Sequence, residues 1–184
     1  MTEEERLELI PWVKGLIPGL EVNSGNQSVF VVSPEDKSIP ALFWEIKKRI
    51  IEKEGLESVE PVDKNILDRH FKDYVAIIHN KGIINKHIDD NRKGLYHSRF
   101  NAYIQLPDKG GETYYNGKPV QTKEGCYVFC RSGIDYHWCE PLESEKERFS
   151  FSYCFLLRLE EVDRIESKRP IGGKMKPWSK TSIQ

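Results

Sequence analysis

The sequence predicts an α+β fold in which helices pack on one side of an antiparallel sandwich or barrel of short strands. Helical patterns occupy the first part of the chain, and short patterns rich in β-branched and aromatic residues follow them. Two of the later segments, residues 99–106 and 148–157, alternate between apolar and polar side chains. Strands that bury one face show this alternation, so we expect the helices to cover the apolar rows.

The helices are predicted from residue spacing and from their ends. Residues 3–17 carry apolar side chains three positions apart, with Pro11 as an expected kink or break: Leu7, Ile10 and Val13. Residues 40–54 form the clearest helical pattern, because a proline opens the segment, a glycine follows it and an apolar stripe runs along it: Phe43, Ile46, Ile50 and Ile51. Residues 63–73 are predicted as a further helix.

The strands are predicted at residues 28–33, 74–79, 99–106, 112–115, 118–121, 126–131, 137–139 and 148–157. Asn116 and Gly117 separate two of them and are a strong signal for a hairpin turn. We therefore expect helical support in residues 1–73, a barrel core in about residues 74–157, and a tail in residues 158–184, all within one domain spanning 1–184.

Composition narrows the class of protein. The 184 residues contain 28 Lys and Arg against 29 Asp and Glu, a net charge of -1, so a nucleic-acid partner is disfavoured. The N-terminus lacks the pattern of a secretory signal, and no apolar run approaches the ~20 residues of a membrane span. We expect a cytoplasmic protein without a membrane partner, whose four cysteines are reduced. Composition does not indicate an oligomeric state.

The polar rows of the two alternating segments bear on function. One contains Arg99, Asn101, Tyr103 and Gln105, and the other contains Arg148, Ser150 and Ser152. If helices cover the apolar rows, the polar rows line the interior of a small barrel. Buried polar groups need partners, so such an interior is expected to be a binding site.

A candidate metal site begins with His87 and Asp89, which lie two apart and point to the same side of an extended segment. His137, 50 positions after His87, begins another extended segment and is the best candidate for a third ligand. Two imidazoles and one carboxylate on one side of an ion leave its opposite side open. This arrangement suits non-haem Fe(II) in oxygen chemistry.

A candidate anchor for a second molecule follows on the next predicted strand. Arg148 lies 11 positions after His137, and Ser150 shares its face. A guanidinium beside a hydroxyl is well suited to hold a carboxylate. A keto acid with two carboxylates, bound to iron at its other end, would use both features.

The ordered set of His87, Asp89, His137 and Arg148 resembles the Fe(II)/2-oxoglutarate-dependent dioxygenase superfamily, over roughly residues 74–157. The glycines of Gly110-Gly111-Glu112 are similar to a turn between core strands in that superfamily. The resemblance implies a double-stranded β-helix, or jelly roll, with N-terminal helices packed against one sheet. It also implies Fe(II) as the metal, 2-oxoglutarate as co-substrate and O2 as oxidant, with succinate and CO2 as co-products.

The resemblance further implies roles for individual residues. His87, Asp89 and His137 would be the catalytic metal ligands. Arg148 and Ser150 would bind the co-substrate, with Tyr103 or Asn101 as additional contacts. His97 and Asp90 are expected to be solvated, and Arg99 to contact substrate or cap the barrel rim.

Several alternatives stay open. The side chains of Cys126, Cys130, His137 and Cys139 could form a structural zinc site, although buried and unreactive thiols are the simpler interpretation. The barrel could also bind a ligand without catalysis. The Arg-x-Ser pattern favours hydroxylation of an unactivated C–H bond in a free amino acid or similar small molecule. A prolyl-type hydroxylase acting on a protein or peptide is the alternative, as is desaturation or ring closure.

Overall fold

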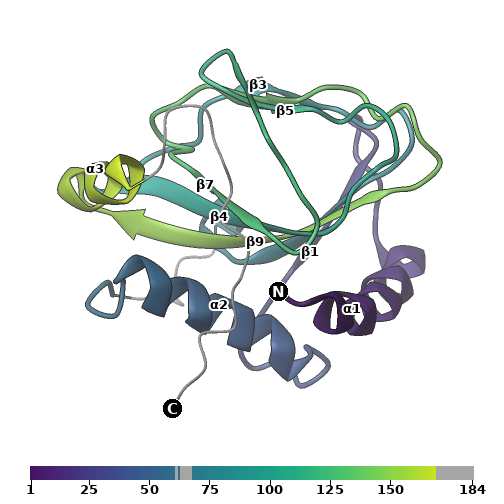
Figure 1. Ribbon diagram of the computed structural model, residues 1–184, viewed down its shortest axis with the longest axis horizontal. Helices are drawn as coiled ribbons and strands as arrows, with labels where there is room; N and C mark the ends of the chain where they lie inside the picture. The colour runs from purple at the N-terminus through teal and green to yellow at the C-terminus, as the bar shows by residue number, and fades with distance from the viewer. Residues whose placement is uncertain (61, 63–67, 169–184) are drawn as a thin grey trace.

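The structure is a computed structural model that describes residues 1–60, 62 and 68–168. It is an α+β fold of two antiparallel sheets that face each other, with helices against the outer face of the larger sheet (Figure 1). The larger sheet has the strand order β1-β2-β9-β4-β7, and the smaller has the order β3-β8-β5-β6.

The elements keep the predicted order, and two that were not predicted lie at Ile84–His87 and Leu159–Ser167. The helices are α1 (Glu3–Leu16), α2 (Ala41–Glu54) and α3 (Leu159–Ser167), with 3-10 turns at Ile17–Gly19 and Arg69–Phe71. The larger sheet contains β1 (Gln27–Val31), β2 (Tyr74–Ile78), β4 (Tyr96–Gln105), β7 (Tyr127–Cys130) and β9 (Arg148–Leu157). The smaller sheet contains β3 (Ile84–His87), β5 (Thr113–Tyr115), β6 (Lys118–Val120) and β8 (His137–Cys139).

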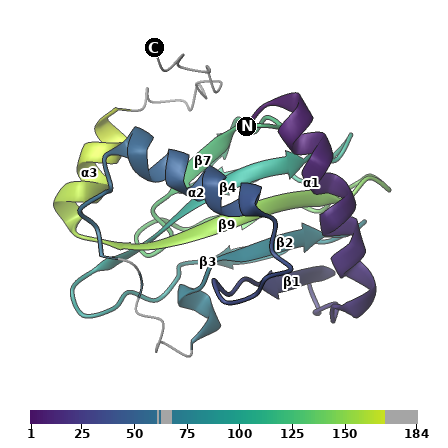
Figure 2. The same ribbon diagram turned by 90° about the horizontal axis from the view of Figure 1, so that it is seen from below.

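The main hydrophobic core lies between the larger sheet and the helices. Figure 2 shows α1 and α2 crossing the outer face of this sheet. Phe151 of β9 is fully buried, with its ring centroid 4.8 Å from that of Phe43 in α2 and 6.0 Å from that of Trp12 in α1. Burial of such a side chain stabilises the fold by about 1.5–3 kcal/mol. The apolar rows therefore face the helices, as their alternation predicts.

The helical stripes agree with the prediction in α2 but not fully in α1. Phe43, Ile46 and Ile50 are buried. In α1 the buried residues are Leu9 and Val13, whereas Leu7 is 54% exposed. The helix also continues through Pro11 instead of breaking there. The predicted stripe in this helix was thus offset, because a spacing of three fits several faces of so short a segment.

Two further predictions need correction or fall outside the described residues. The segment predicted as a tail begins with α3, whose Val162 and Ile165 are fully buried in the main core. Of the helix predicted at residues 63–73, residues 63–67 lie outside the described residues; residues 68–73 contain only a 3-10 turn, and β2 begins directly after them. Within the described part of the chain, no helix combines the length and apolar character that a membrane span requires.

The hairpin turn and the pairing of β4 with β9 determine where the inner side chains lie. Asn116 and Gly117 have φ values of 49° and 78°, as a two-residue hairpin turn requires. Antiparallel pairing sets Asn101 opposite Ser152 and Tyr103 opposite Ser150. The two polar rows consequently share the inner face of the larger sheet, toward the smaller sheet.

Candidate metal centre and co-substrate cavity

The smaller sheet brings His87 and His137 together. They are direct partners on the antiparallel strands β3 and β8, and their ring centroids are 4.1 Å apart. Asp89 follows two residues after His87, and its backbone N–H donates to the carbonyl of Ser132 at 2.8 Å. This bond ties the segment that carries Asp89 to the turn that leads into β8.

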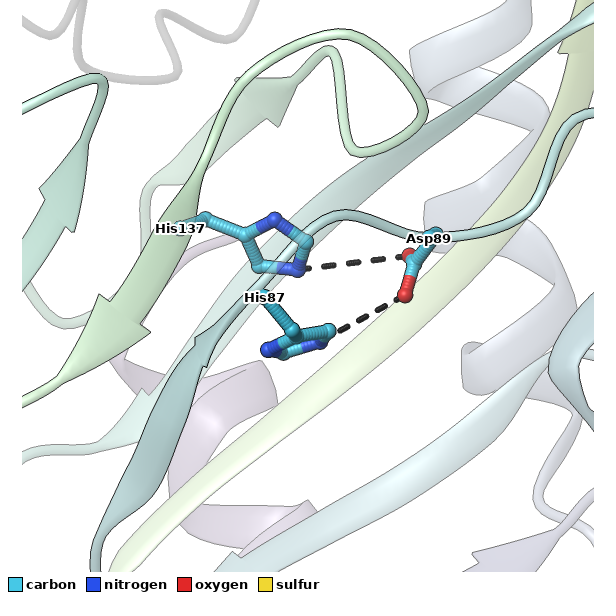
Figure 3. Close-up of side chains that lie close together, drawn as sticks. All are labelled: His87, Asp89 and His137. Atoms are coloured by element: carbon cyan, nitrogen blue, oxygen red, sulfur yellow. Dashed lines mark ion pairs between the residues drawn. The ribbon is translucent and has the colours of Figure 1, made fainter.

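The three side chains converge on one point between the sheets (Figure 3). Nε2 of His87 lies 3.4 Å from Oδ1 of Asp89, and Nε2 of His137 lies 4.0 Å from Oδ2. One ligand atom from each side chain lies within 4.8 Å of the others. This spacing allows all three atoms to contact a single ion.

The second ring nitrogen of each of these histidines, Nδ1, forms a hydrogen bond with a backbone carbonyl. Nδ1 of His87 lies 2.7 Å from the carbonyl oxygen of Asn85, and Nδ1 of His137 lies 3.2 Å from that of Asp135. A carbonyl can only accept, so each ring carries its proton on Nδ1 in the neutral form. The lone pair on Nε2 then faces Asp89, as metal ligation requires.

The protonation states also suit metal binding. Burial alone would raise the pKa of Asp89, but the hydrogen-bonding contact with His87 and the charges of nearby basic groups hold its pKa far below the usual value. Burial lowers the pKa of His137, while the contact with Asp89 raises the pKa of His87. Asp89 is therefore a carboxylate and His137 neutral near pH 7, the forms in which both bind metals.

The cysteines offer no competing metal centre. All four are free and buried, and none belongs to the cluster of converging ligand atoms found among the described residues. Burial raises the pKa of each thiol. This agrees with reduced, unreactive thiols and argues against the zinc site considered from the sequence.

A cavity of about 550 Å³ opens beside the three side chains, within the size range of small-molecule sites. Its walls come from both sheets. Polar lining includes the three converging side chains and four members of the inner rows: Arg99, Asn101, Arg148 and Ser150. Apolar lining comes mainly from the β1–β2 side: Val29, Val31, Ala76 and Ile78.

Arg148 is a buried charge that lacks a counter-ion. Only 4% of it is exposed, and among the described residues no carboxylate oxygen lies within 4.0 Å of its nitrogens. Its Nη1 donates to the carbonyl of Gly111 at 3.1 Å and to Sγ of Cys139 at 2.9 Å, and Nη2 donates to the Tyr103 hydroxyl at 3.2 Å. Its Nε has no hydrogen-bond partner within the part of the chain that the structure describes. A buried guanidinium in this state is poised for an anionic ligand.

The remaining predicted contacts occupy different places. Ser150 and Asn101 line the cavity, and the Asn101 amide donates to the Tyr115 hydroxyl at 3.2 Å. Tyr103 is fully buried and does not line the cavity; its hydroxyl instead accepts from Arg148. Tyr103 therefore holds the guanidinium of Arg148 in position without itself lining the cavity.

The sequence interpretation missed two residues at this centre, His97 and Tyr115, and the approach of Arg99 to Asp89. His97 was expected to be solvated, which is wrong: it is fully buried, with Nδ1 3.4 Å from Oδ2 of Asp89. Arg99 is not at a rim but lies under Asp89, with its Nε 3.9 Å from the same oxygen. Tyr115 lines the cavity, with its ring centroid 6.1 Å from that of His137. For His97 and Arg99, alternation with Asn101 was the available signal, because it puts all three on one face of β4.

The sequence matches no family model and no curated protein. Similarity to solved structures is clear, however. A Pseudomonas putida prolyl-4-hydroxylase matches with a TM-score of 0.63 and 17% identity, over 86% of this chain and 89% of that one. The collagen prolyl hydroxylase of Paramecium Bursaria Chlorella virus-1, in its 2-oxoglutarate complex, matches with a TM-score of 0.60 and 18% identity, over 86% and 92%.

A third match is HygX from Streptomyces hygroscopicus, solved with nickel and 2-oxoglutarate bound. Its TM-score is 0.57 at 10% identity, over 86% of this chain and 80% of that one. Identities this low establish likeness of fold. The resemblance inferred from the sequence motifs is thus confirmed at the level of the fold.

Proposed function

We propose that this chain is an Fe(II)- and 2-oxoglutarate-dependent dioxygenase whose two sheets form a double-stranded β-helix. One observation carries the proposal: His87, Asp89 and His137 converge on the same cavity that holds the unpaired guanidinium of Arg148. A metal-binding group and an anion-binding group in one cavity are what a chelating keto acid requires. The likeness to structures with bound 2-oxoglutarate supports it further.

Each residue then has a defined part. Nε2 of His87, Nε2 of His137 and the Asp89 carboxylate would hold Fe(II) and leave the cavity side open. Arg148 would pair with the far carboxylate of 2-oxoglutarate, and the Ser150 hydroxyl would add a hydrogen bond. When bound, Fe(II), 2-oxoglutarate and O2 supply the oxidation that converts a substrate C–H to C–OH, with succinate and CO2 as co-products.

The chain holds the binding groups of the cavity in position. Tyr103 holds the guanidinium of Arg148 in place, and Tyr115 holds the amide of Asn101 at the cavity wall. The buried strands β4 and β9 close the cavity floor. Arg148 is buried, and a charge held away from bulk water interacts strongly with an opposite charge, which favours binding of a doubly charged keto acid.

For the substrate we propose the aliphatic part of a free amino acid or similar small molecule. Val29 and Val31 line the cavity and are each 40% exposed, so they offer apolar contact at its mouth. A protein or peptide prolyl side chain is the alternative, favoured by the prolyl hydroxylases among the structural matches. An aliphatic wall suits both.

The test is oxygen-dependent formation of succinate from 2-oxoglutarate with added Fe(II), with free amino acids and proline-containing peptides as separate substrate panels. We expect turnover that is stimulated by one panel and abolished in Asp89→Ala. The matched control is Asp90→Ala, because Asp90 is the exposed neighbour in the sequence. Iron-loaded protein without any conversion of 2-oxoglutarate would instead support a non-catalytic binding protein.

A further inference from the structure

His97 is a buried imidazole that lies next to the candidate metal centre. It lies near the start of β4, is fully buried, and neither of its ring nitrogens has a hydrogen-bond partner among the described residues. Buried polar groups are nearly always satisfied, so an unpartnered imidazole needs an explanation. Its ring packs at 5.1 Å on Phe71, a contact that an apolar side chain could make equally well.

One ring nitrogen of His97, Nδ1, lies close to the Asp89 carboxylate. Nδ1 of His97 is 3.4 Å from Oδ2 of Asp89, slightly beyond the usual hydrogen-bond range. Nε of Arg99, two residues along the same face of β4, is 3.9 Å from the same oxygen. Two donors thus approach one carboxylate oxygen, while the other oxygen faces His87.

Arg99 is itself held in a fixed position. Its Nη1 donates to the carbonyl of Lys72 and to the Ser152 hydroxyl, each at 3.2 Å, and Nη2 donates to the carbonyl of His70. The guanidinium carbon lies 4.3 Å from the centroid of the Tyr74 ring. Among the described residues, Asp89 is the only residue whose carboxylate comes within 4.0 Å of its nitrogens.

Backbone hydrogen bonds join His97 to the segment that follows Asp89 and to the turn that precedes His137. Its N–H donates to the Asn91 side chain at 2.9 Å, and the Asn91 amide donates to the carbonyl of Gly133 at 2.8 Å. Its carbonyl accepts from the Gly133 N–H at 2.8 Å and from the Ser132 hydroxyl at 3.2 Å. Small rotations of ring and carboxylate, rather than backbone movement, would therefore close the 3.4 Å gap.

We propose that His97 is a positioning residue which, with Arg99, fixes Oδ2 of Asp89 and thereby leaves Oδ1 to the metal. The inference rests on the metal centre proposed above. His97 is not a fourth ligand, because it lies outside the converging group of ligand atoms. The arrangement resembles in principle the outer hydrogen bonds that orient ligating side chains at metal sites in general.

The test compares Mn(II) binding to the metal-free full-length protein by calorimetry, for the wild type, His97→Leu and His97→Asn. Leucine fills the space but cannot donate, whereas the asparagine amide can donate from nearly the position of Nδ1. We expect the leucine variant to bind Mn(II) about 10- to 100-fold more weakly and the asparagine variant to recover most of the affinity. Metal-free melting temperatures serve as the folding control.

A second measurement needs no variant. In 15N spectra of histidine-labelled wild-type protein loaded with Zn(II), we expect His97 to carry its proton on Nδ1. A proton on Nε2 would overturn the proposal, as would equal Mn(II) affinity in the wild type and His97→Leu, or equal losses in both variants. Absence of Mn(II) binding to the wild type would overturn the metal centre itself, a different result from failure of His97 alone.

Discussion

Replacement of Arg148 by methionine separates co-substrate binding from folding. Methionine has a similar length and no charge, so it fills the space of the arginine stem. The variant loses the cation that we assign to the far carboxylate of 2-oxoglutarate. It also removes a buried charge that lacks a counter-ion among the described residues.

The magnitudes follow from these contacts. Loss of one partner of a buried, hydrogen-bonded charge pair costs about 2–5 kcal/mol, which corresponds to a KM for 2-oxoglutarate raised roughly 30-fold or more. Stability should change far less. The carbonyl of Gly111 and the Tyr103 hydroxyl lose a donor, but the cost of burying an unpaired guanidinium disappears. We expect the free energy of unfolding without ligands to change by less than about 1 kcal/mol, or about 2–4 °C in Tm.

The assay is succinate formation against 2-oxoglutarate concentration, with urea denaturation of the ligand-free protein alongside it. Lys146→Gln is the matched control, because Lys146 is more exposed and pairs with Asp108 and Glu124. An unchanged KM for 2-oxoglutarate in Arg148→Met would refute the assigned role. Strong destabilisation with ordinary binding would instead make Arg148 a structural residue.

Three other predictions test packing, titration and the cavity mouth. Gly133→Ala should lower the free energy of unfolding by about 1–3 kcal/mol in urea denaturation, since the new Cβ would lie 1.9 Å from Oδ1 of Asn91. Gly15→Ala, with no atom within 4 Å of the new Cβ, should raise it by up to about 1 kcal/mol and is the control. Burial raises the pKa of Cys154 from 9.0 to about 11, so the folded thiol keeps a proton that the unfolded chain loses. Stability should therefore fall as pH rises through this window, by at most about 1.4 kcal/mol per pH unit, and Cys154→Ala should reduce the fall. Val31→Asp should raise the KM of the substrate and leave that of 2-oxoglutarate unchanged; the reverse pattern would contradict the assignment of the aliphatic wall.

The sequence predicted the elements whose patterns are long or chemically distinctive. Strict alternation in residues 99–106 and 148–157 identified the strands that became β4 and β9, which pair along most of their length. The Asn116 and Gly117 pair identified the hairpin, because few residues other than asparagine and glycine tolerate positive φ. These signals are local, so no knowledge of tertiary structure is needed to interpret them.

Short or irregular elements were missed for a physical reason. Strand β3 has four residues and an irregular register with β8, so it shows too little alternation to predict a strand boundary. Helix α3 has nine residues, of which only Val162 and Ile165 are buried. Three apolar positions amid many charges, Leu159, Val162 and Ile165, do not distinguish a docked helix from a solvated tail.

At the candidate site, sequence reasoning found the groups whose type and spacing are distinctive, namely His87, Asp89, His137 and Arg148. It missed the surroundings of Asp89. Periodicity showed that Arg99 shares an inner face with Asn101, but not which carboxylate it would approach. That depends on how the loop after β3 folds back over β4, a tertiary feature held by single hydrogen bonds such as that from Asp89 to Ser132.

The most direct measurement of the central claim is Fe(II) binding under anaerobic conditions, with and without 2-oxoglutarate, in the wild type, Asp89→Ala and Asp90→Ala. We predict one Fe(II) per chain, tighter binding when 2-oxoglutarate is present, loss of binding in Asp89→Ala and wild-type behaviour in Asp90→Ala. Wild-type affinity in Asp89→Ala, or no saturable Fe(II) site in the wild type, would contradict it.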